Sequence, residues 1–271
     1  MKHIVESNEV FDLYQKSDSQ TKVRGLISIP HAGMVIPDEF KEFLTKSLVD
    51  INEDVDFKVY DLIDKDRLLD FGVVILVAKI HRVCVDLNRA ENIAVLNWKQ
   101  NTFGNNLTVK EVPKDIEEDL LKRYYRPYYN KLKETLLFHS ERLKDRPFPV
   151  IDLHSMPSRP TAYHLKNNPL QSMVRPDFCV SDLEGKTCSE DFKNKAMHLL
   201  QRHGHSPSLN DPYKGGFITK YINTLPRMNN IQIESNRACY MDEQNKAIIH
   251  NLAAQVRTTL TEMAMDLFSV D

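Results

Sequence analysis

The sequence lacks the features that mark several large classes of protein. None of its apolar runs approaches the length needed to cross a bilayer, and the N-terminus MKHIVESNEVFDLY has no apolar core of a signal peptide. The four cysteines are widely spaced, so they form neither a CxxC metal knuckle nor a dense disulfide framework. The glycine-rich loops GxxxxGK[ST] and GxGxxG are absent. These absences predict a cytoplasmic protein with reduced thiols and no nucleotide site.

An excess of charge of one sign is also lacking. Lys and Arg together number 36, Asp and Glu together 38, and the formal net charge is -2. Because no global field would attract nucleic acid or an anionic membrane, we expect neither as a partner. Any attraction for an anion must therefore be local.

What the chain does contain is an alternation of apolar segments and helical patterns. No Gly/Ser/Pro-rich or highly charged stretch divides residues 1–271, so we expect a single domain with one large core. Apolar segments bounded by breakers predict strands, several of them buried on both faces, at residues 26–29, 73–77, 83–87, 150–153 and 231–233. Helical spacing predicts helices at residues 56–71, 114–144, 189–203 and about 245–268.

The segment 155–188 carries four prolines and little periodicity, which indicates a long loop over one end of the sheet. The alternation of the remaining segments favours an α/β fold. We therefore predict a three-layer αβα sandwich with a mixed, mostly parallel central sheet and helices on both faces.

Polar residues follow or end the apolar segments, in places where a core would not accept them. They are His31, Arg82, Asn88, Arg89, His154 and Glu234. In open α/β sheets, ligands bind in the crevice beyond the carboxyl ends of the strands, so parallel strands would bring these side chains together. Histidines, carboxylates, arginines and an asparagine in one crevice suit a metal ion and an anionic substrate.

Each of these residues also has a structural interpretation when it is taken alone. A histidine after a strand, such as His31 or His154, is more often a hydrogen-bonded structural residue than a metal ligand. Arg82 and Arg89 could be ordinary surface arginines, and Glu234 could cap the turn that follows it. The argument for a site therefore depends on their shared position.

An aspartate pair and a glycine pair are further candidates for the site. Asp54 and Asp56 begin a helical pattern, where Asp54 is the better helix cap, and this leaves Asp56 freer for chemistry. The run Lys214-Gly215-Gly216 holds two of only eight glycines, which indicates close backbone approach or a positive φ.

An ordered set of short motifs supports a family resemblance. The strings SIPHAGMVIP, DVDF, HRVCVDLNRAEN, YRPYYNKL, DLHSMPS, NDPYKGGFIT and QIESNRACYMDE occur between about Ile27 and Glu243, in the order seen in N-formylglutamate amidohydrolases. The chain resembles that family, which is similar to the zinc carboxypeptidases and aspartoacylases, and this implies a zinc-carboxypeptidase-like form of the fold. Asn88-Arg89 and His154-Ser155 fit the order of motifs in those relatives. Met34 stands where they have a ligand glutamate, so a third ligand must come from elsewhere.

The resemblance implies a set of roles. One Zn²⁺ ion would be held by His31, Asp56 and His154, with Asp54 as the alternative carboxylate ligand. Glu234 would act as the general base, Arg82 would stabilise the oxyanion, and Asp152 would orient a ligand histidine. Asn88 and Arg89 would hold one substrate carboxylate. The residues expected to contact a second carboxylate are Lys214, Gly215, Gly216 and Thr219.

The implied reaction is hydrolysis of the amide bond of an N-formyl or N-acyl acidic amino acid. The substrate would be a small molecule with carboxylate groups, most simply N-formyl-L-glutamate, cleaved to formate and L-glutamate in amino-acid catabolism. Two alternatives keep the same residues. One is a deacylase or carboxypeptidase acting on another N-acyl amino acid or a short peptide, and the other is a non-catalytic relative that binds an amino acid.

Overall fold

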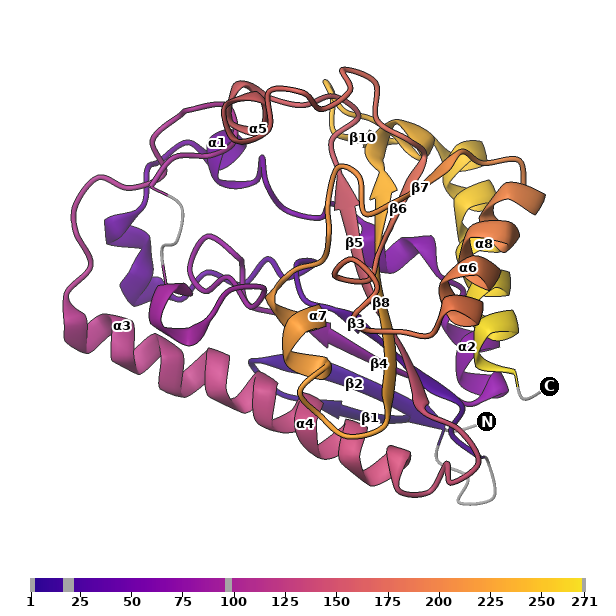
Figure 1. Cartoon of the computed structure of the whole chain (residues 1–271). Coiled ribbons are helices and arrows are strands. Elements are labelled where there is room, and N and C mark those ends of the chain that lie inside the picture. Colours follow the sequence, from indigo (N-terminus) through magenta and orange to yellow (C-terminus); the bar gives the residue numbers. More distant parts are fainter. Residues whose placement is uncertain (1–2, 17–21, 96–98, 270–271) are drawn as a thin grey trace.

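An eight-stranded mixed sheet forms the centre of the computed structural model, which describes residues 3–16, 22–95 and 99–269 (Figure 1). The strand order is β1-β2-β4-β3-β5-β8-β6-β7. The strands are β1 His3–Ser7, β2 Phe11–Lys16, β3 Gly25–Ile29, β4 Val73–Ala78, β5 Phe148–Met156, β6 Phe178–Ser181, β7 Pro207–Leu209 and β8 Met228–Asn236. The four central strands β4, β3, β5 and β8 run parallel, whereas β1, β2 and β6 each pair antiparallel with a neighbour. The prediction of a mixed, mostly parallel central sheet is confirmed.

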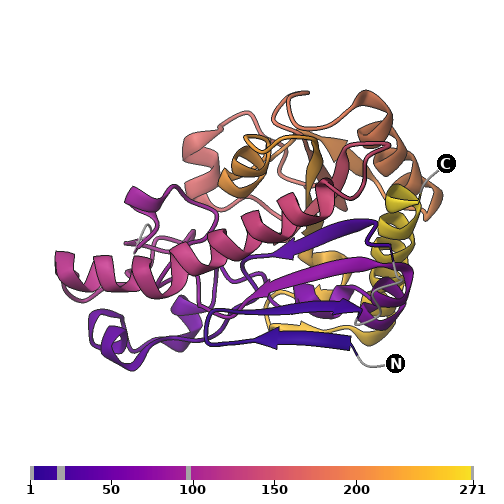
Figure 2. The ribbon, with the colours of Figure 1, turned by 90° about the horizontal axis from the view of Figure 1, so that it is seen from below.

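Helices cover both faces of this sheet. One face carries α2 Lys65–Phe71, α6 Glu190–Arg202 and α8 His250–Phe268; the other carries α3 Lys114–Leu120, a π-helical turn Leu121–Tyr125, α4 Arg126–Ser140 and α7 Phe217–Ile222. Figures 1 and 2 show the long helix formed by α3 and α4 on one side of the strands and α8 on the other. Within the described ranges, no helix combines the length and the apolar character that crossing a membrane requires.

The central strands are buried on both faces, and this divides the core in two. Leu26 of β3 packs in the cluster under α4, while Ile27 and Ile29 of the same strand pack in the cluster under α8. Successive side chains of a strand point to opposite faces, so a strand between two helical layers is mainly apolar on both faces. The predicted three-layer αβα sandwich is therefore confirmed.

The remaining elements are short and lie mainly at the ends of the sheet. They are α1 Leu48–Ile51, α5 Ala162–Asn167, the β9 Met241–Asp242 and β10 Ala247–Ile248 ribbon, and the 3-10 turns Asp38–Phe43, Val59–Leu62, Glu91–Ile93 and Arg237–Cys239.

Two of the predicted elements were wrong. Residues 83–87 form turns, not a strand: the backbone N–H groups of Cys84 and Val85 both bond to the carbonyl of His81, and Val85 makes only an isolated bridge to Val95. Their apolar side chains are buried, which is why the run resembled a strand. The helix predicted from residue 56 begins only at Lys65, after an N-cap by Asp64, because Lys58 takes a left-handed conformation with φ 59°.

Other boundaries also differ from the prediction: the helix predicted at 114–144 ends at Ser140, and β5 and β8 are longer than predicted. The segment 155–188 is not one long loop, since it contains the end of β5, helix α5 and strand β6. The last helix begins at His250 instead of about 245, because the residues before it form the β9 and β10 ribbon.

Candidate active site

The chemically interesting side chains lie at the carboxyl ends of the central parallel strands. His31 comes two residues after β3, His154 lies near the end of β5, and Glu234 lies near the end of β8. β5 and β8 pair in register with His154 beside Glu234. Asp56 comes from the loop after α1, and its backbone N–H bonds to the carbonyl of His31 at 3.2 Å. The parallel topology thus brings together the residues that the sequence placed at strand ends.

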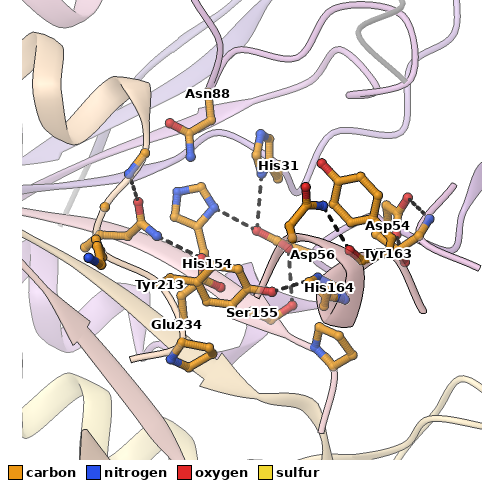
Figure 3. Close-up of a pocket in the computed structure, with 18 of the residues that line it drawn as sticks. His31, Asp54, Asp56, Asn88, His154, Ser155, Tyr163, His164, Tyr213 and Glu234 are labelled. Atoms are coloured by element: carbon orange, nitrogen blue, oxygen red, sulfur yellow. Dashed lines mark hydrogen bonds and ion pairs between the residues drawn. The ribbon is translucent and has the colours of Figure 1, made fainter. Parts of the chain in front are cut away.

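His31, Asp56 and His154 form a compact buried group (Figure 3). One ligand atom from each lies within 4.8 Å of the others. Asp56 Oδ2 is 3.0 Å from His154 Nδ1 and 3.6 Å from His31 Nδ1. Two imidazoles and one carboxylate converging on a point are a donor set that zinc enzymes use, with a position left for water. The three residues fit a metal ion.

The carboxylate of Asp54, the alternative ligand, bonds to Thr102 and not to either histidine. Its carboxylate accepts hydrogen bonds from the backbone N–H of Thr102 at 3.1 Å and from the Thr102 hydroxyl at 2.6 Å. It caps no helix, since the first residues after it form no helix, so the reason for which the sequence favoured Asp56 was wrong. The geometry nevertheless places Asp56 in the histidine group.

Both histidines are backed by a buried carboxylate. His31 Nε2 lies 2.8 Å from Asp86 Oδ1, and His154 Nε2 lies 3.1 Å from Asp152 Oδ2. The hydrogen bond to Asp86 holds a proton on Nε2 of His31 and leaves its Nδ1 available to a metal. At His154, the nearby Asp152 carboxylate favours the same arrangement by its charge. Asp152 was expected in this role, whereas Asp86 was missed because the wrongly predicted strand placed it in the core.

Burial and charge set the protonation of the carboxylates in different directions. Burial alone would raise the pKa of Asp56, but its contacts with the His154 and His31 rings in the metal-free protein outweigh burial and hold the pKa below its usual range. The pKa of Asp86 is also lowered, because Arg82 and His31 outweigh its burial. Burial raises the pKa of Glu234 to about 8. Asp56 is therefore suited to a metal, and Glu234 to exchanging a proton near neutral pH.

Arginines surround the group. Arg82 donates to Asp86 Oδ2 at 3.0 Å and to the carbonyl of Asp54 at 2.8 Å. Arg237 was missed, although it follows Glu234 by only three residues. Its guanidinium donates to the carbonyls of Glu53 at 3.1 Å and Val55 at 2.8 Å, and so fixes the loop that carries Asp56.

A cavity of about 340 Å³ opens over these residues. Of the residues expected to bind substrate, those that line it are Asn88, Arg89, Lys214, Gly215 and Gly216. Thr219 is fully buried outside the lining, and its hydroxyl donates to Gln232 Oε1 at 3.3 Å. The Lys214 ammonium pairs with Glu184 at 2.5 Å, and the Gly216 N–H donates to Gln232 at 2.7 Å.

The two glycines have the features that the sequence indicated. Gly215 has a φ of +119°, and a Cβ on Gly216 would lie 2.1 Å from Asn88 Nδ2. Both expectations, a positive φ and a close approach, are confirmed, and Gly216 leaves room for the Asn88 side chain.

A profile of the N-formylglutamate amidohydrolase family matches residues 23–241, which include every residue of the site described above. The chain belongs to the N-formylglutamate amidohydrolase family. It is therefore an amidohydrolase, in agreement with the resemblance seen in the sequence motifs. No curated protein matches the chain.

Solved structures share the fold of this family member. An N-formylglutamate amidohydrolase from Ralstonia eutropha JMP134 has 22% identity and a TM-score of 0.81, with 96% of this chain and 98% of that chain covered. Gene product Atu2144 from Agrobacterium tumefaciens has 14% identity and a TM-score of 0.65, with 95% and 97% covered. At these identities the similarity establishes the fold.

One wall of the amidohydrolase cavity consists of residues that the sequence analysis left out. Tyr163 and His164 come from α5, and Tyr213 precedes the glycine pair. The Tyr213 hydroxyl lies 3.1 Å from His164 Nε2 (Figure 3). Tyr163 and His164 were missed because α5 was taken for part of a loop, whereas Tyr213 stood in the quoted motif NDPYKGGFIT without a role.

Proposed function

We propose that this amidohydrolase cleaves N-formyl-L-glutamate to formate and L-glutamate, using one Zn²⁺ ion held by His31, Asp56 and His154. The observation that carries the proposal is the convergence of these three buried side chains, with a carboxylate behind each histidine, in the cavity of a chain of this family. A carboxylate behind each histidine favours a proton on Nε2, so both Nδ1 atoms can serve as ligands at one point when a metal ion binds.

The residues around the group can carry out the steps of amide hydrolysis. A Zn²⁺ ion held by these residues would supply Lewis acidity and would lower the pKa of a water molecule towards neutrality. Glu234 lines the same cavity and lies beside His154 in the sheet, so its carboxylate accepts the proton of the attacking water and returns it to the departing amine. The Arg82 guanidinium is held in place by Asp86 and Asp54, and its charge stabilises the negative charge that develops on the carbonyl oxygen.

The cavity offers contacts for an acidic substrate. Asn88 and Arg89 line it and would hold one carboxylate, as proposed from the sequence. The backbone at Lys214-Gly215-Gly216 borders the same space, but the Gly216 N–H already donates to Gln232. A second carboxylate therefore needs a donor besides this N–H group.

The test combines metal analysis with turnover of N-formylglutamate. Glu234→Gln should keep its zinc and lose turnover by roughly 10²- to 10⁴-fold, the usual range for a general base. His154→Ala should lose the metal. Near-normal turnover in Glu234→Gln would exclude it as the base, and full zinc content in His154→Ala would exclude that residue as a ligand.

A panel of substrates tests the acyl group. N-acetylglutamate, N-formyl derivatives of neutral amino acids and short acidic peptides should be hydrolysed more slowly than N-formylglutamate. If any of these compounds were hydrolysed faster, that compound and not N-formylglutamate would be assigned as the substrate. Tight binding of glutamate without metal and without turnover would show a binding protein instead.

A further inference from the structure

Tyr213, His164 and Arg175 form a hydrogen-bonded chain at the wall of the cavity, and the proposed reaction gives none of them a role. Tyr213 lies between β7 and α7, His164 on α5, and Arg175 just before β6. The Tyr213 hydroxyl is 3.1 Å from His164 Nε2 and 3.1 Å from Arg175 Nη1. Figure 3 shows Tyr213 and His164 joined in this way beside His154 and Ser155.

The proton on the His164 ring is fixed by the start of α5. Thr161 and His164 form a capping box, in which His164 Nδ1 accepts from the backbone N–H of Thr161 at 3.2 Å. An N–H group can only donate, so Nδ1 carries no hydrogen. Burial lowers the pKa of His164 to about 4, which keeps the ring neutral at pH 7. The ring proton therefore sits on Nε2 and points at the Tyr213 oxygen.

Arg175 supplies a second donor to the same oxygen. A guanidinium has no acceptor, and Arg175 is buried, with its Nη1 atom also donating to the carbonyl of Pro157 at 3.1 Å. A phenol oxygen that accepts from two donors has no further lone pair to offer, but it still carries its own hydrogen. Among the described residues, no protein acceptor receives that hydrogen. Tyr213 lines the cavity, so a molecule bound there can offer the acceptor.

We propose that His164 and Arg175 fix the Tyr213 hydroxyl as a hydrogen-bond donor into the cavity, where it binds one of the two carboxylates of the substrate. The inference rests on the proposed function, since it assigns the second carboxylate contact that a dicarboxylate substrate needs. Tyr213 touches the substrate, and His164 is a positioning residue that acts through Tyr213.

Other hydrogen-bond donors near the three candidate metal ligands already donate to protein acceptors. The Tyr213 hydroxyl can therefore supply a contact that these donors do not. Arg237 donates to the backbone carbonyls of Glu53 and Val55, and the Gly216 N–H donates to Gln232. Burial raises the pKa of Tyr213 to about 12, so its hydroxyl keeps its proton and cannot repel an anion. A donor that cannot also act as an acceptor selects for a substrate oxygen over an N–H group.

The first experiment measures kcat and KM of Tyr213→Phe with N-formylglutamate. A hydrogen bond to a charged group is removed, so KM should rise roughly 10- to 100-fold while kcat changes little. The same comparison uses N-formyl-2-aminopentanoate, which lacks the side-chain carboxylate, and 4-formamidobutanoate, which lacks the other one. The effect of the substitution should disappear with one of these two substrates and persist with the other. A loss of kcat with unchanged KM, or an equal effect on all three substrates, would overturn the inference.

The second experiment tests the positioning role of His164. His164→Ala should raise KM by about as much as Tyr213→Phe, and the double variant should be no worse than either single variant, because both changes remove one interaction. Independent, multiplicative effects would refute the coupling. Tyr221→Phe, on α7 and outside the cavity lining, is the matched control and should leave both constants unchanged.

Binding of L-glutamate, measured by calorimetry on the zinc-loaded protein, separates this inference from the proposed function. If the wild type binds glutamate and Tyr213→Phe weakens that binding, the inference holds even if N-formylglutamate is not hydrolysed. If N-formylglutamate is hydrolysed and Tyr213→Phe binds glutamate as tightly as the wild type, the role of Tyr213 is refuted while the proposed function stands.

Discussion

Asp86→Asn gives the sharpest test of the metal centre, because it changes one charge without changing side-chain volume. Asp86 is fully buried and accepts from His31 Nε2 at 2.8 Å, from Arg82 Nη2 at 3.0 Å and from the backbone N–H of Asn88 at 2.9 Å. An asparagine retains an acceptor oxygen for part of this set but offers no negative charge to Arg82 or to the His31 ring.

Two effects of the substitution can be worked out separately. Loss of a carboxylate behind a ligand histidine typically weakens metal binding about 10- to 100-fold, or about 1.4 to 2.7 kcal/mol. Removing one partner of a buried ion pair costs about 3 to 5 kcal/mol of folding free energy. Arg82 keeps its bond to the carbonyl of Asp54 at 2.8 Å, so we expect the lower end, about 3 kcal/mol.

Zinc affinity is measured by competition with a chromophoric chelator, and folding free energy by urea unfolding of the metal-free protein. Asp54→Asn is the matched comparison, because it removes a carboxylate two residues from Asp56 that bonds to Thr102 instead of a histidine. It should change zinc affinity by less than roughly twofold. Unchanged zinc affinity in Asp86→Asn would refute the assignment of Nδ1 as the ligand atom of His31, and a large loss in Asp54→Asn would restore Asp54 as a ligand.

Three further predictions concern the metal, the cavity and the core. A chelator should abolish hydrolysis of N-formylglutamate and lower the melting temperature, and Zn²⁺ should restore both; full activity after chelation would rule out metal dependence. Gly216→Ala should lower the folding free energy by about 1 to 3 kcal/mol in urea unfolding, because its Cβ would overlap the Asn88 amide, and unchanged stability would contradict the packing described. Burial lowers the pKa of His139 to about 4, so below its unfolded value of about 6.5 the unfolded state binds the extra proton and stability falls as the pH drops towards 4. His139→Leu should reduce this fall when unfolding is compared at pH 7 and pH 5, and an unchanged pH dependence would mean that the histidine titrates normally in the folded protein.

The sequence predicted the central strands well and the edges of the sheet poorly. β3, β4, β5 and β8 are buried on both faces, so each contains a mainly apolar segment that is visible without any tertiary information, although Asp152 interrupts β5 and Gln232 interrupts β8. β6 has only the four residues FCVS, and they follow a proline-rich stretch without periodicity, which led to the prediction of a loop there. The prediction for residues 83–87 was wrong in the opposite sense. The apolar side chains of this segment are buried in turns, and the apolar run was taken for a strand.

The candidate metal ligands were predicted from the sequence only in part. His31 and His154 were found because parallel strands end at one edge, a rule that needs only their order in the chain. Asp56 was favoured over Asp54 by a capping argument that the structure does not support; the choice depends on Thr102, which lies far along the chain and binds Asp54.

By itself, the sequence determined the layered α/β fold, the family of the chain and the place of the site at the strand ends, because these follow from apolar periodicity and from motifs in a fixed order. Only the tertiary structure decided which atoms face one another. Asp86 behind His31, Arg237 against the loop of Asp56, and Tyr213 between His164 and Arg175 are contacts between segments far apart in the sequence. Such contacts depend on the register of the sheet and the path of the loops, and no local pattern encodes either.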